Sequence, residues 1–267
     1  MEKALCTVLV NSCDQYSDTW HPFFTLLKKY WPDCPYPLCL NTETKSCDEK
    51  SVHVLNSMSS SWGKRLYLAL ERIESEYVVV LLDDFFLRQK VDSDEIAKCI
   101  ARMNADREIA VFYYNRITGY TETSIKYKKY YIMTPSNTKN RYMINCQAAL
   151  WRKNILMEAV KHSETPWDLE ERAFAHLPEE MKRMKYYCLK DAWYDEIRVN
   201  DVFSYVLVRE KGYGVWQSKW LWNNKKLFRQ EKIHVNMKSL GRMSRFSFVL
   251  EKFKRHIKDR WKIIRRR

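Results

Sequence analysis

Two adjacent carboxylates, Asp83 and Asp84, end the continuously apolar run YVVVLL at residues 77–82. An apolar run of this length predicts a strand that is buried on both faces of a sheet. In open α/β sheets, ligands bind beyond the carboxyl ends of the strands. Carboxylate oxygens at that place can hold a divalent cation, which bridges phosphate oxygens and neutralises a diphosphate leaving group. The pair therefore indicates a metal site for phosphate chemistry, with a helix cap or a turn as the alternative.

The segment that leads to these acids reads SWGKRLYLALERIESEYVVVLLDD from Ser61 to Asp84. It places Trp62 and Arg65 at the start of a predicted helix, and Arg65 precedes Asp83 by 18 positions. In this respect the chain resembles the inverting GT-A glycosyltransferases, in which a Gly/Ala-Arg element opens a helix and the next strand ends in a DxD-type motif. The resemblance implies a donor nucleotide sugar bound by Trp62, Arg65 and Asp83.

The beginning of the chain fits the same family. An apolar strand predicted at residues 7–10 is followed by Asn11, Ser12 and Asp14, where the family places the loop that binds the nucleotide. The acidic motif departs from the family pattern, because it reads Asp-Asp-Phe rather than Asp-X-Asp. The resemblance therefore implies a Mn or Mg ion that is held by Asp84 and is not necessarily obligatory.

The segment TPWDLEE at residues 165–171 combines a helix start with acids. Thr165 is a predicted N-cap and Asp168 is the acid of a capping box. Bacterial surface-polysaccharide glycosyltransferases carry a similar Pro-Trp-acid-X-Glu element, and inverting enzymes of this fold use a carboxylate to deprotonate the acceptor hydroxyl. The resemblance implies Glu170 or Asp168 as this general base, and Glu170 is preferred because capping alone explains Asp168.

Two later residues complete the predicted site. Lys219 lies in the run GYGVWQSKW at residues 212–220, and members of the family similarly end near a Lys-Trp pair. We expect Lys219 to meet the donor diphosphate, although a hairpin with packed tryptophans is an equal alternative. His234 is a candidate second metal ligand, because GT-A enzymes often recruit a late histidine; a solvated side chain is the alternative.

The elements that must position these residues alternate along the chain. Apolar residues at helical spacing predict helices near residues 20–31, 66–77, 93–103, 153–161 and from 166 onward. Apolar runs predict strands at 7–10, 36–40, 52–55, 77–82, 109–114, 142–151, 185–189 and 213–216. This alternation predicts an α/β fold, a single Rossmann-like GT-A domain over residues 1–224 with a mostly parallel central sheet. Residues 116–140 indicate only an irregular excursion or a hairpin.

The net charge of +14 belongs to the end of the chain. Residues 225–267 carry 16 Lys and Arg against 3 Asp and Glu, whereas residues 1–224 carry 31 against 30. Within the basic segment, apolar residues recur at steps of three or four: Phe246, Leu250, Phe253, Ile257, Trp261 and Ile264. The pattern predicts a basic amphipathic C-terminal helix that binds an anionic membrane surface, or else docks on its own domain.

The cysteines and the apolar segments indicate where in the cell the protein lies. The eight cysteines show no CxxC spacing, no signal peptide is recognisable, and no apolar stretch approaches the roughly 20 residues of a membrane span. We therefore expect a reduced, cytoplasmic protein that is peripheral on the inner face of the cell membrane.

Together these features predict a hexosyltransferase of cell-surface polysaccharide synthesis, making capsule or lipopolysaccharide by inverting single displacement. Its partners would be a nucleotide-sugar donor and a saccharide or lipid-linked oligosaccharide acceptor. One rival is a nucleotidyltransferase acting on sugar phosphates, which usually carries a glycine-rich loop after the first strand; residues 11–15 contain no glycine. The other is a basic nucleic-acid-binding protein, which the nearly neutral residues 1–224 argue against, so no nucleic acid is expected. P-loop, GxGxxG, HExxH and GxSxG motifs are absent.

Overall fold

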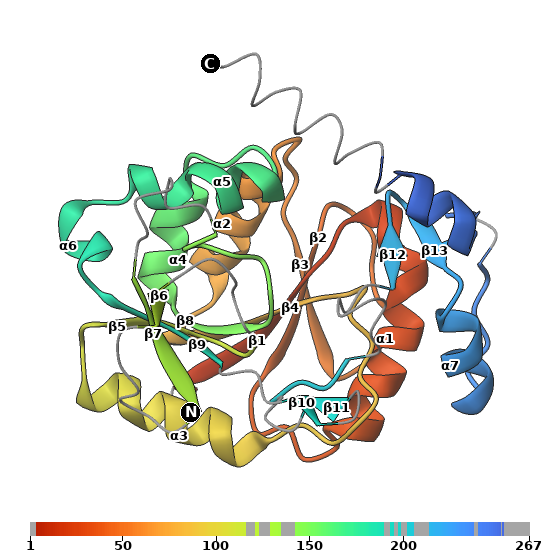
Figure 1. The fold of residues 1–267 in the computed structure, drawn as a ribbon, viewed down its shortest axis with the longest axis horizontal. Coiled ribbons are helices and arrows are strands. Elements are labelled where there is room, and N and C mark those ends of the chain that lie inside the picture. Colours follow the sequence, from red (N-terminus) through yellow and green to blue (C-terminus); the bar gives the residue numbers. More distant parts are fainter. Residues whose placement is uncertain are drawn as a thin grey trace.

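A computed structural model describes residues 4–115, 121–122, 129–134, 142–189, 193–194, 197–198, 202–205, 214–237, 240–251 and 253. Its centre is a sheet of nine strands with helices on both faces (Figure 1). The predicted α/β class with a mostly parallel central sheet is thereby confirmed.

The strand order of the central sheet is β3-β2-β1-β4-β8-β5-β9-β7-β6. Strands β8 and β7 run antiparallel to their neighbours β4, β5 and β9, and β1 pairs in parallel with both β2 and β4. Their bounds are β1 (Cys6–Asn11), β2 (Leu38–Thr42), β3 (Val52–Asn56), β4 (Tyr77–Leu82), β5 (Ile109–Tyr113), β6 (Thr121–Glu122), β7 (Tyr130–Thr134), β8 (Ala149–Arg152) and β9 (Lys185–Leu189).

Two predicted strands differ from the observed ones. β2 begins at Leu38 rather than at residue 36, because Pro37 has no N–H to donate to a ladder. The strand predicted over residues 142–151 shrinks to β8, since residues 142–145 are held as a loop in which the Tyr113 hydroxyl donates to the carbonyl of Met143 (2.9 Å) and accepts from the N–H of Asn145 (3.0 Å). The hairpin expected within residues 116–140 is seen as β6 paired with β7; the other residues of that stretch lie outside the described part of the chain.

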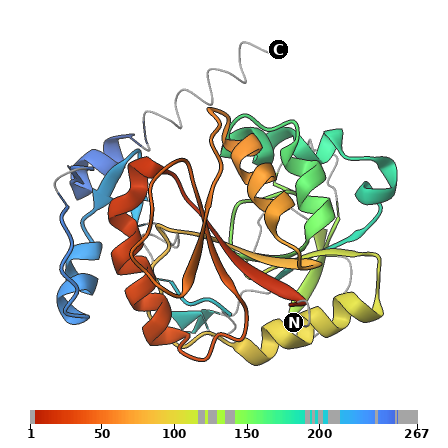
Figure 2. The ribbon, with the colours of Figure 1, turned by 180° about the vertical axis from the view of Figure 1, so that it is seen from behind.

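Two helices cover one face of the sheet and three cover the other, as Figures 1 and 2 show from opposite sides. On the first face lie α1 (Ser17–Tyr30) and α3 (Ser93–Ala105); on the second lie α2 (Trp62–Arg72), α4 (Lys153–Val160) and α5 (Pro166–His176). Alternate residues of β1 and β4 belong to the two different apolar clusters, as expected for strands buried on both faces.

The starts of α2 and α5 are fixed side by side. The Ser61 hydroxyl caps α2 by accepting from the N–H of Lys64 (3.3 Å), and the N–H of Trp62 donates to the carbonyl of Glu164 (3.2 Å), directly before α5. Glycine is required at position 63, because a Cβ there would overlap the carbonyl oxygen of Ser163. This close approach sets Trp62 at the carboxyl ends of the parallel strands.

A second, three-stranded sheet packs beside α1. It contains β12 (Val215–Trp216), β13 (Lys219–Leu221) and β14 (Arg242–Met243). Along the chain, α7 (Asn224–Gln230) lies between β13 and β14. The remaining short elements are η1 (Asp14–Tyr16), α6 (Glu179–Lys182), β10 (Trp193–Tyr194) and β11 (Ile197–Arg198). Within the described residues, no helix is long and apolar enough to cross a bilayer.

Residues beyond the predicted domain end at 224 continue to pack on the domain. Phe228 lies edge-on against Phe86 with ring centroids 5.2 Å apart, and Leu240 and Phe248 are buried. Residues 245–251 and 253 are helical, as the amphipathic pattern predicts, and residues 254–267 lie outside the described part of the chain.

Candidate functional site

The carboxyl ends of β1, β2, β3 and β4 form one edge of the sheet, and the predicted donor-binding residues gather there. Asp83 follows β4 and is almost completely buried. Its Oδ2 accepts hydrogen bonds from the hydroxyls of Ser12 (2.5 Å) and Thr19 (2.6 Å), and the Ser12 oxygen in turn accepts from the indole N–H of Trp20 (2.7 Å). Burial raises the pKa of Asp83 to about 6. Asp83 therefore joins β1, α1 and β4, and its carboxylate holds Ser12 in place.

Asp84 has a different environment, although it is the next residue. The residue is half-buried; its carboxylate accepts from the N–H of Val215, while its carbonyl accepts from the N–H of Gly214 (2.5 Å). A Cβ at position 214 would overlap the Phe86 ring and the Asp84 carbonyl, so glycine allows the strand to approach this closely. Burial, and then the charge of Asp83, raise the pKa of Asp84 well above its usual range.

The surroundings of Asp84 fit a cation shared with a ligand. A carboxyl group with a raised pKa ionises when a positive charge comes beside it. Mg²⁺ is usually held by one or two carboxylates plus substrate phosphates and water. The described residues contain no group of three or more His, Cys, Asp or Glu that could hold a metal by itself. Asp84 could accordingly hold such an ion together with a diphosphate.

Next to Asp84, the ends of β1 to β3 carry polar atoms that are buried without a hydrogen-bond partner. Asn11 accepts from the side-chain amide of Asn41 (2.7 Å), but Oδ1 of Asn41 has no partner within the described structure. The same is true of Oγ of Ser57 and Nε of Arg65. Buried polar groups without partners are uncommon, because each costs about 1–3 kcal/mol. Three of the eleven such atoms in the described residues therefore lie at this edge, where a polar ligand or water could supply their partners.

Arg65 is held at this edge by an acid that the sequence analysis missed. Its Nη2 lies 3.1 Å from Oε1 of Glu43, and its Nη1 donates to the carbonyl of Ser59 (2.9 Å). Glu43 also accepts from the N–H of Asp14 and so joins the end of β1 to α2. Glu43 directly follows β2, so its position after a strand was the signal that could have revealed it.

The side chain of Asp14 is committed to the loop after β2. It accepts from the hydroxyls of Thr42 and Thr44 (2.6 Å each) and from the N–H groups of Thr44 and Lys45 (both 3.1 Å). Burial opposes its ionisation, but these hydrogen bonds outweigh it and lower the pKa well below its usual range. Asp14 therefore holds the loop after β2 against the end of β1, and its carboxyl group is ionised when it does so.

The two candidate bases on α5 are clearly distinguished. Asp168 completes the predicted capping box with Thr165 and is paired with Arg172, and these hydrogen bonds, led by that of Arg172, lower its pKa. A carboxylate with a lowered pKa is a weaker proton acceptor. Glu170 is half-buried, its Oε1 accepts from the N–H of Cys146 (3.2 Å), and its carbonyl accepts from the N–H of Tyr142 (2.7 Å). These differences favour Glu170.

The structure places Lys219 in the hairpin that contacts Asp84, whereas His234 lies away from Asp84. Lys219 is exposed and pairs across the hairpin with Trp216, next to the Val215 that contacts Asp84. His234 follows α7, where Glu231 accepts from the hydroxyl of Tyr30 (2.7 Å) at the last turn of α1. Asp83 accepts from Thr19 in the first turn of α1. Because α1 has 14 residues, its two ends are about 20 Å apart. The direction of α7 thus takes His234 away from Asp84.

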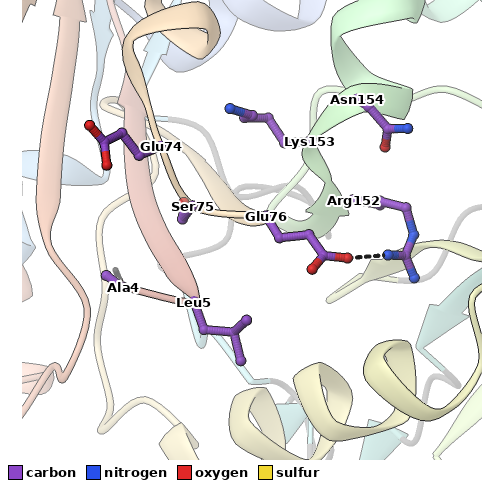
Figure 3. Close-up of a pocket in the computed structure, with 8 residues that line it drawn as sticks. All are labelled: Ala4, Leu5, Glu74, Ser75, Glu76, Arg152, Lys153 and Asn154. Carbon is purple, nitrogen blue, oxygen red and sulfur yellow. Dashed lines mark hydrogen bonds and ion pairs between the residues drawn. The ribbon is translucent and has the colours of Figure 1, made fainter. Parts of the chain in front are cut away.

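A cavity of about 510 Å³ lies at the opposite edge of the sheet, lined by residues that precede β1 and β4 and follow β8 (Figure 3). The guanidinium of Arg152, which lines the cavity, has protein partners: it pairs with Glu76 (2.7 Å) and donates to the carbonyls of Ile109 (3.2 Å) and Met103 (2.9 Å). We therefore assign this cavity to the packing of the fold.

No protein-family profile matches the chain, and no curated protein sequence is similar to it. Among solved structures, TarS 1–349 of Staphylococcus aureus is 12% identical with a TM-score of 0.43 over 70% of this chain, which spans 57% of that protein. A cytidylyltransferase from Leptospira borgpetersenii is 11% identical with a TM-score of 0.44, covering 85% of this chain and 95% of that one. The UTP-bound UGPase of Acinetobacter baumannii is 10% identical with a TM-score of 0.45, covering 70% and 86%. At these identities and TM-scores the comparisons assign no chemistry, which must be argued from the residues of this chain.

Proposed function

We propose that this chain is a nucleotide-sugar-dependent glycosyltransferase whose donor site is the carboxyl edge of β1 to β4. The observation that carries the proposal is the set of buried polar atoms without partners, on Asn41, Ser57 and Arg65, at the same edge of the sheet as the half-buried Asp84. The base and ribose of a nucleotide offer the donors and acceptors that these atoms lack. A diphosphate extending from that place toward β4 would reach Asp84.

The proposed reaction is a single displacement. Glu170 takes the proton from an acceptor hydroxyl, whose oxygen attacks the anomeric carbon of the donor sugar as the bond to the diphosphate breaks. The products are the glycosylated acceptor, with inverted anomeric configuration, and a nucleoside diphosphate. Lys219 approaches the leaving diphosphate from the hairpin. Mn or Mg, when bound at Asp84, supplies Lewis-acid stabilisation of the departing charge, and it is not necessarily obligatory.

The proposal extends to the acceptor and to the place of the reaction. Residues 225–267 carry a large excess of Lys and Arg, and the helix that includes residues 245–251 exposes apolar side chains. Such a helix suits the interface of an anionic membrane. We accordingly propose a saccharide or lipid-linked oligosaccharide acceptor in capsule or lipopolysaccharide synthesis, with the enzyme on the cytoplasmic face of the membrane.

The products test this proposal. Incubated with nucleotide sugars and a membrane fraction as the acceptor source, the enzyme should release a nucleoside diphosphate, with sugar becoming lipid- or saccharide-bound. A nucleotidyltransferase would instead produce pyrophosphate from a nucleoside triphosphate and a sugar phosphate. Pyrophosphate formation without any nucleoside diphosphate release would replace the proposed reaction with the rival one.

A further inference from the structure

Most of the large apolar side chains that the described structure exposes lie at the end of the molecule formed by the carboxyl ends of β1 to β4. We call this end, which holds the proposed donor site, the donor edge. Eight such residues are exposed, and seven lie on segments at the carboxyl ends of the parallel strands or on the helix beside them: Met58, Tyr142, Trp167, Phe246, Val249, Leu250 and Phe253. The eighth, Leu5, precedes β1 and lies at the opposite edge. Four of the seven share one helix face, and a contiguous exposed apolar face marks an interaction surface.

Two of these residues are next to residues of the candidate site. Met58 is 80% exposed and lies between Ser57, whose buried hydroxyl has no partner, and Ser59, whose carbonyl holds Arg65. Trp167 is 58% exposed in the first turn of α5, the helix that carries Glu170. Neither side chain contributes to the core, so packing does not explain why an apolar residue stands there.

The third contribution comes from the helix at residues 245–253. One side is anchored: Phe248 is completely buried and its ring lies 5.5 Å from that of Trp216 and 5.3 Å from that of Trp222. The other side exposes Phe246, Val249, Leu250 and Phe253, at the spacing of one helix face. Trp216 is in β12 beside Val215, so the helix is tied to the strand that contacts Asp84, and Figure 1 shows it at the same end of the molecule as α5.

We infer that the whole donor edge, and not only the basic tail, is the surface that meets an anionic lipid bilayer, with Met58 and Trp167 inserting on one side of the site and the helix at 245–253 on the other. Met58, Tyr142 and Trp167 stand singly on separate segments and the other four share one helix face, an arrangement that suits a fluid bilayer better than the contiguous core of a protein interface. Residues 225–267, which include this helix, carry 16 Lys and Arg against 3 acids, and this positive charge complements an anionic headgroup layer.

This inference rests on the proposed function for its consequence. If the donor edge faces the bilayer, the acceptor hydroxyl has to arrive from the membrane side, so the acceptor is a saccharide carried on a lipid and held near the headgroups. A freely diffusing oligosaccharide would not need the site to be oriented in this way.

The test is sedimentation of the full chain with vesicles, in the absence of any donor. The wild type should bind vesicles of phosphatidylcholine mixed with an equal amount of phosphatidylglycerol, and bind vesicles of phosphatidylcholine alone much more weakly. Met58→Ser and Trp167→Ser should each weaken partitioning about three- to tenfold, because each removes a side chain that leaves water on binding. Leu5→Ser, a matched change at the opposite edge, should leave partitioning unchanged.

Two outcomes would overturn the inference. Partitioning of Met58→Ser and Trp167→Ser equal to that of the wild type would restrict membrane contact to the tail. Self-association in solution that these substitutions abolish, without vesicle binding, would assign the surface to a second copy of the chain. Since no donor is present, failure of the glycosyltransferase proposal would leave the vesicle result intact, and a nucleotide-dependent rise in the melting temperature of Met58→Ser reports on the donor site separately.

Discussion

Replacement of Asp84 by Asn is expected to lower the rate of sugar transfer at least about a hundredfold while the protein remains folded. The amide cannot supply the negative charge that would hold a cation against the donor diphosphate, and such electrostatic stabilisation contributes several kcal/mol to group transfer. The fold should tolerate the change, because Asn can still accept from the N–H of Val215 and the carbonyl of residue 84 still accepts from Gly214. Nucleoside diphosphate release and thermal unfolding measure the two effects.

A suitable control for this substitution is Glu164→Gln, which removes an exposed carboxylate at the start of α5 where only its carbonyl makes a described contact, to Trp62. It should transfer sugar at the wild-type rate. Full activity in Asp84→Asn, with or without Mn²⁺, would contradict the role assigned to Asp84.

Asp83, the acid adjacent to Asp84, is expected to make the free energy of unfolding depend on pH. The pKa of Asp83 is raised by burial from 3.8 to about 6, so the folded state binds the proton more tightly than the unfolded state. The stabilisation from this proton is complete below pH 3.8 and is lost as the pH rises through 6, amounting to about 3 kcal/mol. Asp83→Asn lacks this titration. The unfolding free energy of the variant, relative to the wild type, should therefore rise between pH 4 and pH 8 in denaturant titrations.

Asp168→Asn provides a control of opposite sign. Arg172 and Thr165 lower the pKa of Asp168, so its contribution to stability is present at neutral pH and is lost as the pH falls through the folded-state pKa. Relative to the wild type, Asp168→Asn should be least stable at neutral pH and approach it in acid. A stability difference for Asp83→Asn that stays constant from pH 4 to pH 8 would contradict the assignment of a raised pKa to Asp83.

Much of the fold follows from local patterns in the sequence. The runs at residues 77–82 and 109–114 were predictable as strands because strands buried on both faces are continuously apolar, and the run at 185–189 because four apolar residues follow Lys185. The start of α5 was predictable because Thr165, Pro166 and Asp168 fix it locally. The antiparallel direction of β8 was not, because strand direction depends on which neighbours a strand pairs with, and that is decided by packing far along the chain.

The site shows the same division. Asp83 and Asp84 stand out because acids directly follow an apolar strand, and Arg65 because of its spacing from them. Glu43 carries a weaker form of this signal, since it is a single acid that directly follows β2, and Asn41 and Ser57 carry none. They join the site only because the sheet order β3-β2-β1-β4 places the ends of β2 and β3 beside β1. Conversely, the sequence offers His234 as a candidate metal ligand without showing that the preceding Glu231 contacts the last turn of α1.

The amphipathic tail was also only partly predictable. The spacing of Phe246, Leu250 and Phe253 predicts an apolar helix face, and the structure exposes these three side chains. The anchoring side chain is Phe248, which lies off that face and is buried against Trp216 and Trp222. A hydrophobic residue off the main stripe was the signal that the helix also packs on its own domain.

The central claim is that the carboxyl edge of β1 to β4 binds a nucleotide next to Asp84. The most direct measurement is the thermal unfolding of the full chain with UDP, GDP, CMP, dTDP and ADP, each with and without Mn²⁺. One nucleotide at about 100 times its dissociation constant should stabilise the protein by about 2.7 kcal/mol, which shifts the melting temperature by a few degrees. We expect one of these nucleotides to raise the melting temperature clearly more than the others, and Mn²⁺ to increase its effect. Unfolding curves unchanged by every nucleotide at high concentration, together with a shift produced by RNA or DNA, would contradict it.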